Sequence, residues 1–409
     1  MHLIRALLDQ GHKVSIVAPR DEYTIRLEQA GCTFTPIRIN NQGTNPVTET
    51  LTVWSYLRIY SRLKPEIILH FTPKPNIYGS MAAGMLKIPC INNISGLGTA
   101  FIREGLLGRV VRILYRLSQR SADKVFFQNK DDLDMFVASG LVKAHKAGLL
   151  PGSGVDVEKF NLRLRDLGIQ RLRDWGIEGL GDLGIEELRD SGIEEGRCCN
   201  QSSIDIYQPS NEGQDFQYGP RESNPGTGVV FLLIARLIWD KGIREYAEAA
   251  RIIKTGYPEA EFRLLGFVDE NNPGAVPEET IREWEEEGIL KWLGRQDDVR
   301  PYIAAADCVV LPSYYREGTP RTLLEAAAMG KPLIAADTVG TREPVQDGVT
   351  GYLCRPRDAG DLAGQMERMI NIGHEKRLEM GQRGREKMER EYDENIVINK
   401  YMQVIQEIL

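Results

Sequence analysis

The sequence contains no long apolar run. Although 42% of its 409 residues are hydrophobic, no stretch approaches the ~18 to 20 apolar residues that a membrane-spanning helix needs. The opening residues, MHLIRALLDQGHKV, lack the separate basic, apolar and small-residue zones of a signal peptide. We therefore expect a cytoplasmic protein that does not cross a bilayer.

Cysteine is scarce and scattered. Only two of the six cysteines are neighbours, and no second pair lies at the spacing of zinc ligands. The pattern predicts reduced, structural thiols. The six are Cys32, Cys90, Cys198, Cys199, Cys308 and Cys354.

Net charge is divided unevenly along the chain. Residues 1–151 hold 19 Lys and Arg against 11 Asp and Glu, a net charge of +8, and the remainder carries −15. A basic region favours a polyanionic partner, meaning nucleic acid, anionic lipid or a phosphorylated substrate. Because no recognisable nucleic-acid-binding module accompanies the charge, we expect no nucleic-acid partner.

The length fits two domains of ordinary size. Apolar, β-branched runs alternate with helical patterns in both halves, as in parallel sheets with helices on both faces. The predicted strands lie at 14–19, 66–71 and 124–129, and again at 229–236, 261–267, 289–294, 308–313 and 332–337. This rhythm predicts an α/β fold with two Rossmann-like, doubly wound domains in series.

Two segments depart from this alternation of strands and helices. From Leu164 the chain repeats L-x-D-x-G-I every eight residues, with a glycine in each unit, and a polar run follows. Such short units bury little, so a poorly ordered insertion is favoured over a small solenoid. The chain also opens with the helical segment LIRALLDQG, whereas a doubly wound domain usually begins with a strand. The first strand of the N-terminal domain is therefore predicted to be missing.

These features divide the chain into four parts. We predict an N-terminal Rossmann-like domain over 1–155 and a linker with the insertion over 156–228. A second Rossmann-like domain follows over 229–393, and a helix over 394–409 is expected to pack back on the N-terminal domain.

Two carboxylates flank a turn at the end of a predicted strand. In EGTPRTLLE, Glu317 follows the strand 308–313 and Glu325 lies about one and a half turns into the next helix. Thr319 as helix cap and Pro320 in the first turn would leave backbone N–H groups for a phosphate. The alternative is a solvated loop residue and an ordinary helix charge.

Two cations occupy a similar place at another strand end. Arg236 ends the predicted strand 229–236, and Lys241 follows five residues later at a helix start. Together they can neutralise a diphosphate, with Arg236 as a bidentate donor. Two ordinary surface cations are the alternative, but positive charge there opposes the helix dipole.

Together these segments resemble family-4 retaining glycosyltransferases of the glycosyltransferase-B fold. The resemblance rests on Arg236 and Lys241, on LPSYYREGTPRTLLEAAAMGKPLIAAD and on GSGVDVEKF (152–160), and it covers nearly the whole chain except 162–227. It implies two domains that face each other across a cleft. HFTPKPNIYG (70–79) and INNISGLGTAF (91–101) are similar to bacterial enzymes that extend undecaprenyl-diphosphate-linked sugars with a hexose or N-acetylhexosamine for surface polysaccharides.

The resemblance implies roles for individual residues. Arg236 and Lys241 would hold the diphosphate of a UDP-sugar, Glu317 the hydroxyls of the transferred sugar, and Glu325 the ribose. Because the family offers no clear nucleophile, we expect same-face attack, in which the leaving diphosphate takes the acceptor proton. No metal and no cofactor is implied. The other implied donor-binding residues are Gly318, Thr319, Pro320, Gly266 and Arg295.

The N-terminal domain is expected to hold a glycan or polyprenyl-diphosphate-sugar acceptor. His70, Asn93 and Ser95 lie at strand ends and are candidates for contacting it, although a lone histidine is more often structural. The segment 103–120 predicts a basic amphipathic helix for an anionic membrane surface, or a helix packed on the core. Its expected apolar stripe is Leu107, Val110, Leu114 and Leu117, and its arginines are Arg109, Arg112, Arg116 and Arg120.

Two other functions remain open. A UDP-sugar epimerase can share this fold and diphosphate site, but the basic helix and the LPSYYREGTPRTLLEAAA segment favour transfer. An inactive or binding-only remnant would fit the expected loss of the first strand.

Overall fold

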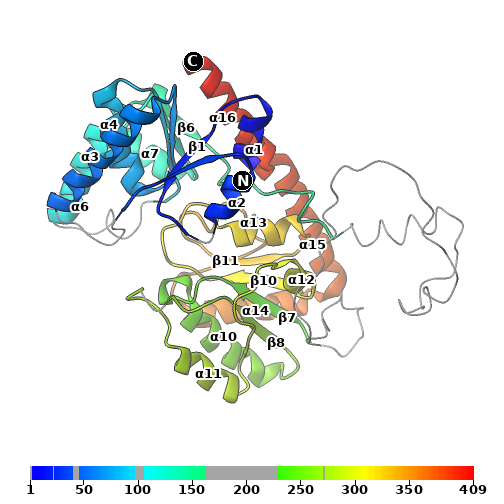
Figure 1. Ribbon diagram of the computed structural model, residues 1–409. Helices are drawn as coiled ribbons and strands as arrows, with labels where there is room; N and C mark the ends of the chain where they lie inside the picture. The colour runs from blue at the N-terminus through cyan, green and yellow to red at the C-terminus, as the bar shows by residue number, and fades with distance from the viewer. Residues whose placement is uncertain (1, 22, 40–45, 97–105, 163–227, 270–271) are drawn as a thin grey trace, which may run out of the picture.

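The computed structural model describes residues 2–21, 23–39, 46–96, 106–162, 228–269 and 272–409. Two α/β domains lie one above the other in Figure 1, and C-terminal helices run from the second domain back to the first. The octapeptide repeat and most of the predicted linker lie outside the described residues. The predicted architecture of two Rossmann-like domains is confirmed.

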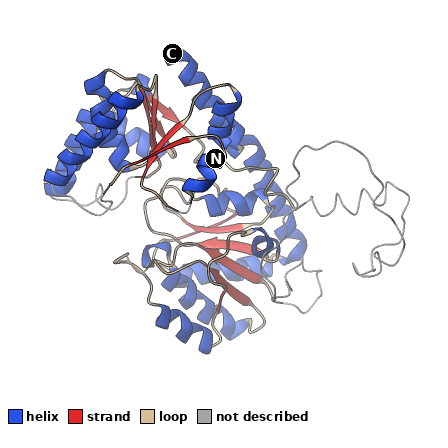
Figure 2. Cartoon of the chain, viewed as in Figure 1, coloured by secondary structure: helices blue, strands red, loops and turns tan. Residues whose placement is uncertain are grey.

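The second domain is built on one six-stranded parallel sheet. The strand order is β12-β11-β10-β7-β8-β9, and the sheet forms a layer between helices (Figure 2). Its strands are β7 (Val230–Ile234), β8 (Glu261–Leu265), β9 (Lys291–Trp292), β10 (Cys308–Leu311), β11 (Leu333–Ala336) and β12 (Gly351–Cys354).

Alternate side chains of this sheet enter two cores. Phe231 and Leu233 pack in one cluster with residues of α10 and α14, and Leu232 packs in the other with residues of α12 and α13. Because both faces are covered, β7 reads as an unbroken apolar run. The helices of this domain are α10 (Ile243–Gly256), α11 (Glu278–Glu286), α12 (Arg300–Ala304), α13 (Arg321–Ala328), α14 (Ala359–Asn371) and α15 (Gly373–Lys387), with short helices η3 (Trp239–Lys241) and η4 (Met388–Tyr392).

The first domain has its parallel strands in two separate sheets. One pairs β1 with β2, and the other has the order β3-β4-β5-β6. Among the described residues, no strand joins the two sheets. The strands are β1 (Ser15–Ala18), β2 (Thr33–Pro36), β3 (Ile68–His70), β4 (Cys90–Ile94), β5 (Lys124–Phe127) and β6 (Ala147–Leu149).

Helices cover both faces of the four-stranded sheet. On one face, Ile77 of η1, Tyr115 of α6 and Phe136 of α7 share a core with the strands. On the other, Tyr401 of α16 (Glu394–Ile408) packs against Phe126, so the last helix covers the first domain (Figure 1). The helices of this domain are α1 (His2–Asp9), α2 (Thr24–Gln29), α3 (Pro46–Leu63), α4 (Ser80–Leu86), α6 (Leu106–Ser118) and α7 (Lys130–Ala138), with η1 (Pro75–Gly79) and η2 (Ala144–Lys146).

Two predictions concern membranes and thiols. None of the helices that the structure describes is both long and apolar enough to span a membrane. Within the described ranges four cysteines are free and buried, namely Cys32, Cys90, Cys308 and Cys354. Burial raises the pKa of the Cys90 thiol to about 12, so this thiol stays protonated and unreactive.

Candidate active site

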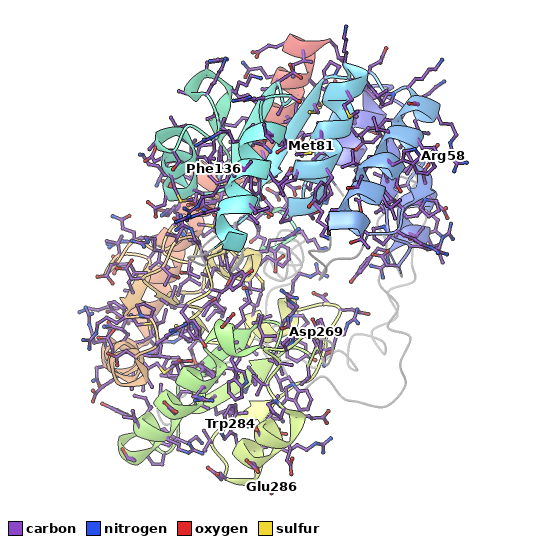
Figure 3. All side chains as sticks on the ribbon, turned by 90° about the vertical axis from the view of Figure 1, so that its left-hand side faces the viewer. Arg58, Met81, Phe136, Asp269, Trp284 and Glu286 are labelled. Atoms are coloured by element: carbon purple, nitrogen blue, oxygen red, sulfur yellow. The ribbon has the colours of Figure 1, made fainter. Side chains whose placement is uncertain are left out.

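Arg236 lies just beyond β7, at the carboxyl edge of the second sheet. Its side chain is 53% exposed, and its guanidinium is 3.7 Å from the carboxylate of Asp269, a loose ion pair. Figure 3 places Asp269 on the side of the second domain that faces the first. Because the pair is loose and solvated, little energy is needed to turn Arg236 toward an anionic ligand.

Lys241 and Glu317 form a close ion pair at the same edge. The lysine Nζ lies 2.5 Å from Glu317 Oε2, and the two side chains are only 13% and 15% exposed. Ser313 Oγ donates to the other oxygen, Glu317 Oε1, at 2.7 Å. The loops after β7 and β10 are thus joined by one charge-neutral pair, where the sequence suggested two independent ligand contacts.

Gly242 fixes the place of Lys241. It follows the lysine with φ 77°, a left-handed conformation that favours glycine, and is the N-cap of α10. A Cβ atom here would collide with the Pro312 carbonyl. The turn therefore holds Lys241 against the loop that carries Glu317.

The start of α13 differs from the prediction in its cap. Thr319 was expected to cap the helix with Pro320 in the first turn, but Pro320 takes the N-cap position and no side chain caps the helix. The Thr319 hydroxyl instead donates to the Gln128 carbonyl of the first domain at 3.1 Å. Thr319 does not cap α13 because its hydroxyl is bonded to the first domain.

Glu325 lies about one turn into α13, four residues after Arg321, and is largely buried. Its Oε1 accepts from Arg321 Nε at 3.3 Å. Burial raises the pKa of Glu325 above its usual range, although Arg321 and Lys159 act in the opposite direction. A buried carboxylate with one partly exposed partner keeps acceptor capacity for a ligand hydroxyl.

Gly266 and Arg295 lie beyond β8 and β9. Gly266 has φ 155°, and a Cβ atom there would collide with the Ala235 carbonyl, so glycine is required by the approach of the β7 loop. The Arg295 guanidinium lies 5.5 Å from the centre of the Phe267 ring. Both residues are therefore at the same sheet edge as Arg236.

The first domain contacts the loop of Glu317 directly. Gly318 packs against the Ser95 carbonyl so closely that a Cβ atom would collide with it. Asn129 Nδ2 donates to the Glu317 carbonyl at 3.4 Å. Gly318 is thus explained by the approach of the other domain, in addition to any phosphate it was predicted to cradle.

His70 lies inside the first domain and not at the domain contact. Its Nδ1 is 2.8 Å from Asn92 Oδ1 and its Nε2 is 3.0 Å from the Tyr60 hydroxyl. Since the amide oxygen can only accept, Nδ1 carries the proton and Nε2 accepts from Tyr60. Burial lowers the pKa of His70 to about 4, so the imidazole is neutral near pH 7. Both ring nitrogens are bonded inside the first domain, which favours the structural alternative, and the acceptor contact stays a prediction.

The other two acceptor candidates lie near the end of β4. Asn93 is buried, and its carbonyl accepts from Asn76 Nδ2 at 2.8 Å. Ser95 follows the strand and presents its carbonyl to Gly318. Of the three candidates, Ser95 alone is placed by these contacts against the second domain.

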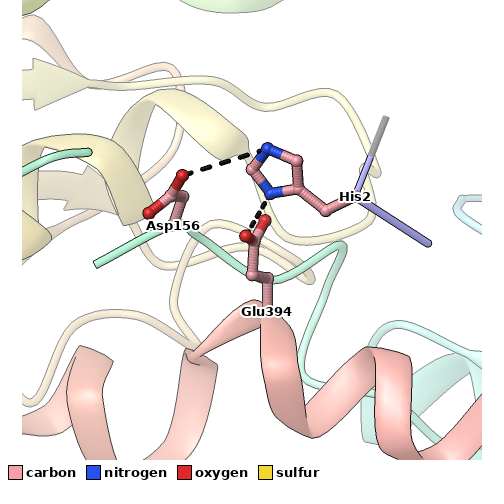
Figure 4. A group of neighbouring side chains, drawn as sticks. All are labelled: His2, Asp156 and Glu394. Carbon is pink, nitrogen blue, oxygen red and sulfur yellow. Dashed lines mark hydrogen bonds and ion pairs between the residues drawn. The ribbon is translucent and has the colours of Figure 1, made fainter. Parts of the chain in front are cut away.

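A separate charged cluster joins three distant parts of the chain (Figure 4). His2 Nδ1 bonds the carboxylate of Glu394, and His2 Nε2 lies 3.9 Å from Asp156 Oδ2. An imidazole binds a metal through one nitrogen, and Nδ1 is already occupied by Glu394. Only Nε2 and Asp156 would then face an ion, fewer than the three or four ligands of a typical zinc site. The cluster is best described as a structural contact that joins α1, the segment 152–160 and α16.

Sequence reasoning missed the residues that hold Glu317 in place. These are Ser313, which bonds its carboxylate, and Asn129 and Gln128, which bond its loop. The spacing of Asn129 and Asp132 is that of a capped helix start, a signal present at 129–132, just after the predicted strand 124–129. The contacts of Asn129 and Gln128 with the loop of Glu317 join residues 188 and 191 positions apart, so no local sequence pattern could predict them.

Comparisons with known proteins agree with this geometry. A family model described as glycosyl transferases group 1 matches residues 218–387, and one described as glycosyl transferase 4-like matches residues 1–129. A Campylobacter jejuni relative, N,N'-diacetylbacillosaminyl-diphospho-undecaprenol alpha-1,3-N-acetylgalactosaminyltransferase, is 25% identical over 100% of this chain and 95% of its own. The amylovoran biosynthesis glycosyltransferase AmsK of Erwinia amylovora is 28% identical over 43% of this chain and 44% of its own.

Solved structures share the fold. HepE of Anabaena, in complex with UDP and glucose, superposes with a TM-score of 0.69 at 18% identity, covering 100% of this chain and 95% of that one. Sucrose-phosphate synthase of Thermosynechococcus elongatus gives 0.71 at 18% identity, over 100% and 92%. With both domains matched in sequence and in fold, the chain belongs to the glycosyltransferases of the glycosyltransferase-B type.

Proposed function

We propose that this glycosyltransferase moves a hexose or N-acetylhexosamine from a UDP-sugar to a polyprenyl-diphosphate-linked glycan, with retention of anomeric configuration. The observation that carries the proposal is the Lys241–Glu317 pair beside Arg236, at the sheet edge facing the first domain. One cation can reach a diphosphate while its carboxylate partner accepts from sugar hydroxyls. The names of the Campylobacter relative and of the HepE complex support this choice of acceptor and donor.

The donor would place its diphosphate between the two cations. Lys241 would leave Glu317 for the phosphate, and Arg236 would leave its loose pair with Asp269. The uncapped first turn of α13 would add backbone N–H groups. Glu325 would accept from the ribose and Gly266 and Arg295 would border the nucleotide. Because these groups supply positive charge, transfer would proceed without a metal ion.

The reaction would be a same-face substitution. The bond from the anomeric carbon to the diphosphate oxygen breaks, and the acceptor oxygen bonds to that carbon on the same face. The acceptor proton passes to the departing diphosphate. Catalysis would come from stabilising the leaving group and positioning the acceptor.

The helix α6 would contact the membrane that carries such an acceptor. Val110, Ile113 and Leu117 are 50%, 55% and 48% exposed on its outer face, and Arg109 and Arg112 are also exposed. Apolar side chains among arginines suit an anionic bilayer surface. The enzyme would then act at the cytoplasmic face of the membrane.

Product analysis tests the proposal. The protein is incubated with a panel of UDP-sugars and a polyprenyl-diphosphate sugar, and the lipid product is identified with its anomeric configuration. One added sugar with the donor configuration is expected. Donor epimerised without an acceptor would instead identify an epimerase, and inverted product or no turnover with any UDP-sugar would contradict the proposal.

A further inference from the structure

An ion pair crosses between the domains one residue before Glu317. Arg316 Nε and Nη2 donate to Asp132 Oδ1 at 2.8 and 2.5 Å. Arg316 belongs to the loop after β10 in the second domain, and Asp132 belongs to α7 in the first. The resemblance and the proposed mechanism give neither residue a role.

The setting of Asp132 is specific for a cation. Its side chain is fully buried at 0% exposure, in the first turn of α7. Asn129 caps that turn, accepting from the Asp132 N–H at 2.7 Å and donating to Asp132 Oδ2 at 2.9 Å. The second oxygen, Oδ1, is thereby left for Arg316. A buried carboxylate is strongly disfavoured without such a partner, so closing the domains and forming this pair are coupled.

The pair is the first of four successive contacts. We call residues 316–319 the donor loop. After Arg316, the Glu317 carbonyl accepts from Asn129, Gly318 packs on the Ser95 carbonyl, and the Thr319 hydroxyl donates to Gln128. Every residue of the donor loop therefore contacts the first domain.

The donor loop also fixes the carboxylate of Glu317. Its two oxygens are held by Lys241 and Ser313 of the second domain, while its backbone is held by the first. A shift of the backbone would move the carboxylate away from both partners. The position of Glu317 thus depends on groups from both domains.

We propose that the Asp132–Arg316 pair is a closure latch that sets Glu317 for the transferred sugar only when the two domains are together. Both are positioning residues, and the inference rests on the proposed function in taking Glu317 as the sugar-holding group. When the domains are apart, the nucleotide site remains, but the donor loop lacks its contacts with the first domain. The latch links acceptor-domain closure to completion of the donor site.

The test uses Asp132→Asn and Arg316→Gln in the full chain, with Arg316→Lys as a milder variant. Asp134→Asn is the matched control, because Asp134 lies on the same helix and pairs with Lys130 of that helix on exposed surface. For each protein we would measure the radius of gyration by X-ray scattering with and without UDP, UDP affinity, and kcat and KM for transfer. Thermal melting identifies any variant that fails to fold.

The latch predicts a larger radius of gyration for the Asp132 and Arg316 variants and a kcat lower by roughly 100-fold, with UDP affinity nearly unchanged. Arg316→Lys should lie between these variants and the wild type, and the control should match the wild type. Wild-type radius and kcat in folded Arg316 variants would overturn the latch. If the wild type neither binds UDP nor transfers sugar, the proposed function fails, whereas the scattering comparison still decides whether the pair holds the domains together.

Discussion

At the residue scale, Glu325 is the residue proposed to bind the ribose, and its burial has a cost for the unliganded fold. Its carboxylate is buried beside Arg321, and burial raises its pKa. A carboxyl whose pKa is higher in the folded state destabilises that state when ionised. The penalty is absent below the unfolded pKa and is complete above the folded pKa.

Glu325→Gln is therefore expected to retain or raise the melting temperature near pH 7 while lowering the catalytic efficiency with the donor. Any gain should fade as the pH falls to the usual carboxyl value of 4.5. Loss of a charged acceptor for ribose should reduce kcat/KM for the donor roughly 10- to 100-fold. Thermal melts over this pH range and donor kinetics provide the check. A variant that melts lower at pH 7 but keeps wild-type kcat/KM would show that Glu325 is structural.

His70 gives the first domain a sensitivity to acid. Its pKa is lowered from 6.5 to about 4 by burial, so below pH 6.5 the unfolded chain takes up the proton first. The stability contributed by the neutral imidazole is present above pH 6.5 and is lost as the pH falls toward 4. At ~1.4 kcal/mol per pKa unit, this loss amounts to about 3 kcal/mol.

We expect His70→Gln to be less stable near pH 7, because Asn92 and Tyr60 each lose a hydrogen bond to the imidazole, but its stability should depend less on pH. In urea unfolding, the difference in free energy of unfolding between the variant and the wild type should narrow as the pH falls from 7 to 4. The narrowing should be about 3 kcal/mol at most. Parallel curves for the two proteins would mean that His70 titrates alike in the folded and unfolded states.

At the scale of elements, the sequence predicted long apolar strands better than short ones. The segments around β7, β8, β10 and β11 were located because strands buried on both faces are continuously apolar. No ranges were predicted for β2, β6 and β12, which are short runs with proline, glycine or few β-branched residues. For β4, only a strand end near Asn93 and Ser95 was expected. The opening helix predicted only that a first strand is missing, and the division of the first domain into two sheets was not predicted.

The helix α6 shows how a stripe can be assigned to the wrong face. The expected apolar stripe included Val110, Leu114 and Leu117, yet Val110 and Leu117 are exposed. Leu114 and Val111 pack toward the core beside the buried Tyr115. The helix carries apolar residues on both sides, and periodicity alone could not tell which side the domain covers.

The exposed side of α6 makes membrane binding testable. Ile113→Asn with Leu117→Asn should reduce co-flotation with vesicles that contain anionic lipid, because the substituted side chains no longer enter the bilayer surface. Leu378→Asn on α15 of the second domain is the matched control, since that leucine is 57% exposed. Equal flotation of the double variant and the control would rule out α6 as the contact, and the melting temperature would show that both are folded.

At the scale of the whole molecule, loops from the carboxyl edges of the four-stranded and six-stranded sheets contact each other. This is the edge at which parallel sheets bind ligands. The donor loop lies against Ser95, Gln128 and Asn129 of the first domain, while α16 packs on that domain's far core. The family motifs predicted the donor-site residues Arg236, Lys241, Glu317 and Glu325. The contacts between domains join residues at least 184 positions apart, so neither spacing nor propensity could indicate them.

The central claim is that Arg236 and Lys241 hold a nucleotide-sugar diphosphate as it departs. The most direct measurement is the steady-state rate of transfer from a saturating UDP-sugar for Lys241→Ala, compared with Lys376→Ala at an exposed position of α15. Loss of leaving-group stabilisation predicts a kcat roughly 100- to 1,000-fold lower for Lys241→Ala, with a wild-type rate for the control. A Lys241→Ala enzyme that folds and transfers sugar at the wild-type rate would contradict the account.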